Sequence, residues 1–152
     1  MSLPEIKYAI KKATVIDIFS NLEACDKDFF PPLSERVSLM EYSNKLYENS
    51  VTFEAWNDKK LIGMVAAYFN NVVDSVGYIS NVCVENKFKG NHVASNLMMK
   101  CLHYAAENHF KNIVLEVNAN NNTAISLYEK FNFRTIDIGN GNIKMQLENI
   151  TF

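Results

Sequence analysis

The chain of 152 residues lacks most of the features that mark linkers, membrane segments and nucleic-acid-binding surfaces. Proline (three residues) and glycine (five) are scarce, and no repeat or low-complexity tract interrupts the sequence. No apolar run approaches the roughly 20 residues that cross a bilayer, and the N-terminus lacks the apolar core of a signal peptide. The formal net charge of −2 leaves no basic footprint for nucleic acid. We therefore expect one cytoplasmic domain over 1–152, with no membrane or nucleic-acid partner, in which residues 1–3 could be an expression-tag remnant.

Cysteine is also sparse. The chain has three cysteines, an odd number, and they lie far apart in apolar or helical contexts: Cys25, Cys83 and Cys101. Their spacing matches no metal site, so we expect buried free thiols and no metal.

Hydrophobic periodicity predicts a mixed α/β chain in the order β-α-α-β-β-β-α-β-α-β-β. We expect strands over 6–12, 51–56, 60–69, 75–84, 112–118, 133–138 and 142–147, and helices over 15–24, from Ser34 or Ser38 to 49, from 93 to about 109, and over 124–131. The turns between 51 and 84 are too short for crossovers, which predicts an antiparallel meander. The helix that follows is long enough to bring strand 112–118 parallel to strand 75–84.

A short apolar strand ending at Val84 is followed by a basic, glycine-containing turn and then by the helix that begins near Val93. Free backbone N–H groups at a helix start, together with the helix dipole, favour an anion such as phosphate. Taken alone, this pattern fits a plain strand-to-helix junction equally well.

Two motifs in this order make the chain resemble the GNAT superfamily of acyl-CoA-dependent N-acetyltransferases. The first, V-x-x-x-x-R/Q-x-x-G-x-G/A, falls on 84–94, with Lys89 in place of Arg or Gln and His92 in place of Gly. The second, N-x-x-A-x-x-x-Y-E-K-x-G-F, falls on 121–133, with Asn132 in place of Gly. Lys89 keeps a positive charge but loses the guanidinium fork. The side chain of His92 could crowd the phosphate, help to hold it, or point into solvent.

The resemblance implies that acetyl-CoA binds in a V-shaped gap between the strands that end near Val84 and Asn118. The residues that it assigns to the cofactor are Val82, Cys83, Val84, Lys89, Gly90, Asn91, His92, Val93, Ala94, Ser95 and Asn121. Main-chain groups near Val82 would bond the pantetheine arm and the oxyanion, and the amides of the turn would hold the diphosphate.

The resemblance also assigns the catalytic acid to Tyr128, which would protonate the leaving sulfur; the alternative is a core tyrosine on an amphipathic helix. For the base, Glu116 interrupts an otherwise apolar strand, where a carboxylate is costly unless it faces a cleft or is paired. Some family members carry their base in this context, twelve residues before the tyrosine. A structural glutamate, or a water chain to Tyr78, Ser80 or Glu54, remains open.

The acceptor pocket of this family lies between the first two helices and the last hairpin. Here the expected residues are Phe29, Phe30, Arg36, Tyr78 and Ser80. Aromatic groups with one arginine suit a small polar amine, such as an amino sugar or an anionic amine, and a peptide N-terminus or polyamine fits almost as well. We expect direct transfer in a ternary complex. The alternative is an acyl-CoA-binding module or sensor with little turnover, and a homodimer is neither required nor excluded.

Overall fold

The computed structural model describes residues 5–29 and 31–150, so 1–3 and Phe30 lie outside the described residues. The elements are β1 (Lys7–Ile10), α1 (Val15–Cys25), η1 (Asp26–Asp28), η2 (Leu33–Glu35), α2 (Leu39–Asn49), β2 (Val51–Asn57), β3 (Lys60–Asn71), β4 (Val76–Val84), η3 (Asn86–Phe88), α3 (Val93–Glu107), β5 (Asn112–Asn118), α4 (Asn122–Lys130), β6 (Arg134–Gly139) and β7 (Asn142–Leu147). The expected order and the mixed α/β class are confirmed.

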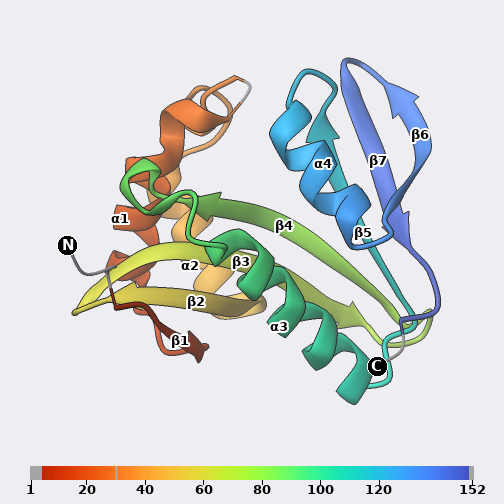
Figure 1. Ribbon diagram of the computed structural model, residues 1–152, viewed down its shortest axis with the longest axis horizontal. Helices are drawn as coiled ribbons and strands as arrows, with labels where there is room; N and C mark the ends of the chain where they lie inside the picture. Colours follow the sequence, from red (N-terminus) through yellow and green to blue (C-terminus); the bar gives the residue numbers. More distant parts are fainter. Residues whose placement is uncertain (1–4, 30, 151–152) are drawn as a thin grey trace.

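All seven strands form one sheet in the order β1-β2-β3-β4-β5-β7-β6 (Figure 1). Every neighbouring pair is antiparallel except β4 and β5, which run parallel on either side of the α3 crossover. The meander and the parallel crossover predicted from the turn lengths are therefore both present.

Side-chain caps start the helices close to where the sequence predicts. Thr14 and Asp17 form a reciprocal capping box at α1. Ser38, not Ser34, caps α2 by accepting from the N–H of Glu41. Ser34 is unavailable because its own N–H and hydroxyl both bond to Asp26.

The helix α3 ends two residues before the expected position. His109 adopts a left-handed φ of 64°, and the N–H of Phe110 bonds to the carbonyl of Ala105. This reversal terminates the helix, because a non-glycine residue at positive φ cannot continue it.

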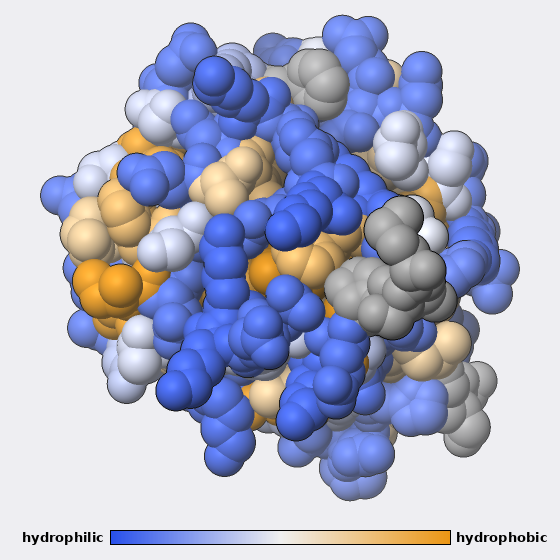
Figure 2. Space-filling model, turned by 60° about the vertical axis from the view of Figure 1, so that its left-hand side comes forward, coloured by the Kyte–Doolittle hydropathy of each residue, from blue (hydrophilic) through white to orange (hydrophobic). Residues whose placement is uncertain are grey.

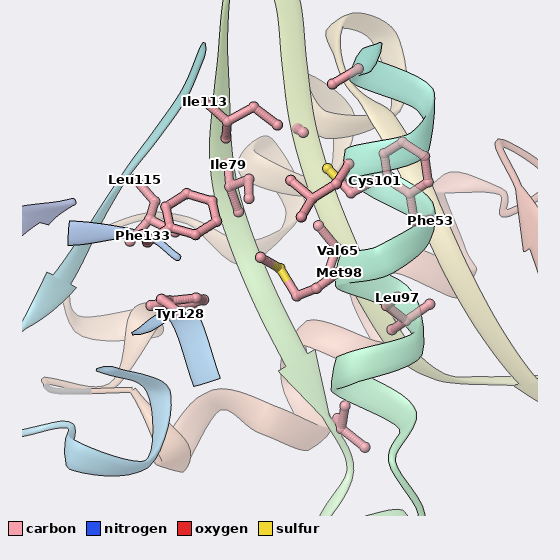
Figure 3. Packing of buried hydrophobic residues seen from close by; sticks show 14 of the residues in the cluster. Phe53, Val65, Ile79, Leu97, Met98, Cys101, Ile113, Leu115, Tyr128 and Phe133 are labelled. Carbon is pink, nitrogen blue, oxygen red and sulfur yellow. The ribbon is translucent and has the colours of Figure 1, made fainter. Parts of the chain in front are cut away.

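The helices cover both faces of the sheet. On one face, α3 and α4 pack over a core that includes Phe53, Val65, Leu97, Met98 and Leu115 (Figure 3). A second buried cluster, which includes residues of α1 and α2, lies on the other face (Figure 1). Among the described residues, none of the helices combines the length and apolar character needed to span a membrane.

Hydrophilic residues cover most of the surface seen in Figure 2, and the hydrophobic ones appear there as small, separate patches. The edge strand β6 is exposed along its whole length. A cleft lies nearer the middle of the sheet, where residues of β4 and β5 line it.

Candidate active site

The strands β4 and β5 separate part-way along their length. Their parallel register runs from Val76 opposite Asn112 to Ile79 opposite Leu115, and no pair follows. Beyond that point β5 keeps its other neighbour, since Asn118 still lies opposite Asn142 of β7. The expected V-shaped gap is therefore confirmed by the register (Figure 1). It opens into a cleft of about 820 Å³.

A bulge in β4 stands where the gap begins. On β3, the neighbours Ala66 and Ala67 lie opposite Asn81 and Ile79, so Ser80 is an extra residue in β4. The hydroxyl of Tyr42 on α2 bonds to both the carbonyl and the hydroxyl of Ser80. The bulge thus anchors this part of β4 to the helix behind it.

Beyond the bulge, the main chain of β4 presents polar groups to the cleft. The N–H of Glu85 bonds to the carbonyl of Ile62, which places the bonded positions of β4 at Glu85 and Cys83. Alternate residues of a strand bond alternate neighbours. The N–H and C=O groups of Val82 and Val84 therefore face the edge from which β5 has withdrawn.

Three more donors lie at the start of α3. The first intrahelical N–H bond runs from Asn96 to the carbonyl of His92, so the N–H groups of Val93, Ala94 and Ser95 have no partner among the residues that the structure describes. All three residues line the cleft, and no acidic side chain occupies the first turn. Such an arrangement attracts an anion.

Gly90 and His92 give the turn before α3 its shape. Gly90 has a φ of +87°, and a Cβ there would meet nothing within 4 Å, so its conformation and not space favours glycine. His92 adopts a left-handed φ of 58° and is exposed at the cleft. The side chain of Asn91 turns back to the carbonyl of Phe88, and Asn91 does not line the cleft.

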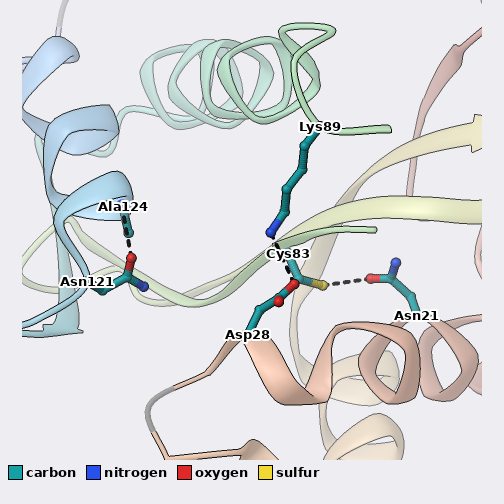
Figure 4. Close-up of polar contacts among 6 residues, drawn as sticks. All are labelled: Asn21, Asp28, Cys83, Lys89, Asn121 and Ala124. Atoms are coloured by element: carbon teal, nitrogen blue, oxygen red, sulfur yellow. Dashed lines mark hydrogen bonds and ion pairs between the residues drawn. The ribbon is translucent and has the colours of Figure 1, made fainter. Parts of the chain in front are cut away.

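Lys89 forms an ion pair that the sequence did not predict. Its ammonium lies 3.1 Å from the carboxylate of Asp28 in η1, across the cleft from Asn121 (Figure 4). Both partners are partly exposed, so the ion pair adds little to stability. It does mean that Lys89 is engaged by an acid, and Asp28 becomes a cleft residue that sequence reasoning missed.

The opposite wall comes from α4. Asn121 caps this helix by accepting from the N–H of Ala124, so its Oδ1 is occupied while its Nδ2 makes no bond within the described chain (Figure 4). Tyr128 is 6% exposed, packs beside Phe133 at a ring distance of 6.0 Å and lines the cleft (Figure 3). Burial raises the pKa of Tyr128 well above that of a free phenol, so the group stays protonated at neutral pH.

Glu116 lies on β5 just beyond the last residue paired with β4. Its side chain is exposed in the cleft, and it makes no hydrogen bond or ion pair within the described chain, although Lys144 is directly opposite on β7. Burial, and to a lesser extent the charge of Glu116, raises the pKa of Tyr78. The tyrosine ring stacks on Tyr68 with an interplanar angle of 15°.

Glu54 does not belong to this site. It is fully buried and does not line the cleft. Its carboxylate accepts from the N–H groups of Lys12 and Ala13, the hydroxyl of Thr52 and the indole of Trp56. A water chain from the cleft to Glu54 is therefore wrong, because protein donors already surround the carboxylate.

Residues of the segment between α1 and α2 form one wall of the cleft. Phe29, Leu33 and Arg36 line the cleft there, as do Tyr78 and Ser80 from β4, where the acceptor is expected. The two bonds from Ser34 to Asp26 hold the segment and lower the pKa of the Asp26 carboxyl. The expected acceptor residues thus lie together, except Phe30, which is outside the described residues.

The three cysteines are buried and free, as expected. Cys83 donates to Oδ1 of Asn21 at 2.8 Å, on the α1 side of β4 (Figure 4). Contact with Cys25 and burial raise the pKa of its thiol well above the usual value. Cys83 lines the cleft as a protonated thiol, which makes it a poor nucleophile.

Comparison with known proteins agrees with this geometry. Residues 16–133 match the sequence model described as the acetyltransferase (GNAT) family. This chain belongs to that family.

Among curated GNAT relatives, the chain is similar to N-acetylaspartate synthetase of Xenopus tropicalis, with 33% identity over 79 residues, which are 52% of this chain and 29% of that protein. It is also similar to human N-alpha-acetyltransferase 30, with 33% identity over 57 residues, or 38% of this chain and 16% of that protein. The matched regions thus span less than a third of either relative.

Among solved structures, the fold is similar to that of PaiA N-acetyltransferase from Thermoplasma acidophilum in complex with coenzyme A. The TM-score is 0.73 at 14% identity, covering 93% of this chain and 99% of that chain. At this identity the similarity shows a shared fold and nothing more.

Proposed function

We propose that the protein is an N-acetyltransferase that moves the acetyl group of acetyl-CoA directly to a primary amine in a ternary complex. The observation that carries this proposal is the gap between β4 and β5, which lies beside three N–H groups at the start of α3 that have no partner within the described chain. A cofactor with an amide-containing arm and a diphosphate needs both features. When bound, it supplies the acetyl thioester.

In this proposal, the amides of Val93, Ala94 and Ser95 hold the diphosphate, and Lys89 adds charge. Gly90 and His92 shape the turn around it. The free main-chain groups of Val82 and Val84 bond the pantetheine arm and the developing oxyanion. The amide of Asn121 supplies a further donor from the opposite wall.

Two side chains then handle the protons. Glu116 takes one proton from the acceptor ammonium, and its unpaired carboxylate in the cleft suits that role. As the C–N bond forms and the C–S bond breaks, Tyr128 gives its phenolic proton to the sulfur. Solvent takes the second proton that the nitrogen loses and restores the one that Tyr128 gave.

The acceptor is a primary amine of a small molecule or of a peptide. The name of the Xenopus relative points to aspartate as the acceptor, and that of the human relative points to an α-amine. The cleft is lined by the aromatic side chains of Tyr78 and Phe29, which suit the ring face of an amino sugar. The cleft would admit any of these beside the α1–α2 segment.

The test is to incubate the protein with acetyl-CoA and a panel of amines, and to measure CoA release and the acetylated product by mass spectrometry. We expect turnover that falls about 10²-fold in Tyr128→Phe, while acetyl-CoA affinity stays within about twofold, because the acid acts only in the transition state. Raised thermal stability with acetyl-CoA but no product from any amine would instead indicate a binding module. Equal losses in turnover and affinity would contradict the acid role of Tyr128.

A further inference from the structure

The charged side chains that line the cleft are not balanced. Lys89 and Asp28 neutralise each other at 3.1 Å. That leaves Lys27, Arg36 and Glu116 without an ion pair within the described chain. The unpaired charges are two positive groups on the α1–α2 segment and one negative group on β5, opposite each other across the cleft.

Arg36 is the better placed of the two cations. Its N–H bonds to the carbonyl of Leu33, whose side chain is only 6% exposed and packs in the cluster beneath α1 and α2. The neighbouring Ser34 is bonded twice to Asp26. These two contacts therefore fix the position of the backbone just before Arg36.

Arg36 makes no ion pair within the part of the chain that the structure describes. Asp26 is occupied by Ser34, and Asp28 by Lys89. Glu35 precedes Arg36 but does not line the cleft. A guanidinium presents donors in a planar fork that suits a carboxylate or a phosphate. Leu33 packs in the cluster that includes residues of α1 and α2, and Arg36, three residues later, is exposed and lines the cleft.

We propose, on the basis of the proposed function, that the acceptor is an amine that also carries an oxyanion, which Arg36 binds while Glu116 faces the ammonium. A purely cationic polyamine is disfavoured, since it would meet two unpaired cations. The ligand chemistry shared by the candidates is an amine and a carboxylate or phosphate in one molecule. Arg36 is then a specificity-determining residue.

Three matched pairs of acceptors test this and distinguish the source of the oxyanion: aspartate against asparagine, glucosamine 6-phosphate against glucosamine, and a tripeptide with Glu against Gln at its second position. For at least one pair, we expect the wild-type protein to show the higher kcat/KM with the anionic member. Arg36→Gln should lower that value about 10- to 100-fold, the range for a charged hydrogen bond, and leave the neutral member within about twofold. Arg36→Lys should recover part of the loss.

Glu35→Gln is the matched control, because Glu35 adjoins Arg36 and lies outside the cleft; it should change neither member of any pair. A wild-type preference for every neutral member would overturn the inference. So would an equal loss for both members in Arg36→Gln, or a raised KM for acetyl-CoA in that variant.

A second readout separates this inference from the proposed function. Calorimetric titration of the CoA-loaded protein with the same pairs measures acceptor binding without turnover. If no amine is acetylated, the proposed function fails. Even then, preferential binding of an anionic member, lost in Arg36→Gln, supports the inference, and equal binding within every pair refutes it.

Discussion

The regions around Glu54 and Glu116 use the same residue type in opposite ways. Both glutamates lie on strands, Glu54 on β2 and Glu116 on β5. Glu54 is fully buried and surrounded by donors, including the N–H groups of Lys12 and Ala13. Glu116 is exposed in the cleft and accepts no hydrogen bond within the described chain.

The different surroundings of the two glutamates suit them to different roles, one structural and one chemical. A buried carboxylate whose oxygens accept several hydrogen bonds holds two parts of the chain together. Here these parts are the strand β2 and the connection between β1 and α1. A carboxylate in a cleft without donors is free to exchange a proton with a ligand. Glu54 is thus a structural group, and Glu116 is the one available to react.

The largest expected effect is that of Glu54→Ala on stability. It leaves several buried donors without an acceptor, so we expect the free energy of unfolding to fall by more than about 3 kcal/mol, at 1–3 kcal/mol for each orphaned group. Urea titration measures the change. Glu116→Ala is the matched control and should alter stability by less than about 0.5 kcal/mol. Similar losses in the two variants would show that both glutamates are structural.

The second prediction concerns the chemistry of Glu116. If it is the base, Glu116→Gln should lower kcat by about 10²-fold, the range for general base catalysis. The shape of the pH–rate profile should also differ between the wild type and the variant. A pH–rate profile of the same shape in both proteins would assign the base elsewhere.

A smaller effect is expected at Tyr42, which anchors the bulge beside the cleft. Burial raises the pKa of Tyr42 in the folded protein, so above the free phenol value of about 10 only the unfolded chain loses the proton readily. Stability should therefore fall as pH rises past that value. Tyr42→Phe should make this fall shallower and cost about 1 kcal/mol at neutral pH through the lost bonds to Ser80. Unfolding curves at pH 7 to 11 measure both, and an unchanged slope would count against the contribution of Tyr42.

The smallest expected effect lies at the cofactor end of the cleft. Asp28→Asn removes the acid that engages Lys89, which frees the ammonium for the diphosphate. We expect acetyl-CoA to bind about two- to fivefold more tightly, consistent with an exposed ion pair of 0.2–1 kcal/mol. Lys89→Gln should weaken binding, and weaker binding in Asp28→Asn would show that the aspartate positions the lysine.

Local signals predicted much of the fold. The boundaries of β5 and β7 agree with the periodicity. Thr14 and Ser38 start their helices because each hydroxyl accepts from the backbone N–H three residues later, which is a local contact. The residues of the two motifs also include many that line the cleft, because residues of one strand, turn and helix stay close together in any fold that forms those elements. Spacing alone did not distinguish Ser34 from Ser38.

What the sequence alone determined is the set of elements, their order and the two motifs that place the chain among the acetyltransferases. Tertiary structure decided which glutamate is buried, where β4 gains its extra residue and that Asp28 engages Lys89. The physical reason is distance along the chain. Periodicity and capping depend on neighbours within a few residues. By contrast, Ala13 lies 41 residues from Glu54 and Asp28 lies 61 residues from Lys89, so each pair meets only in the folded chain.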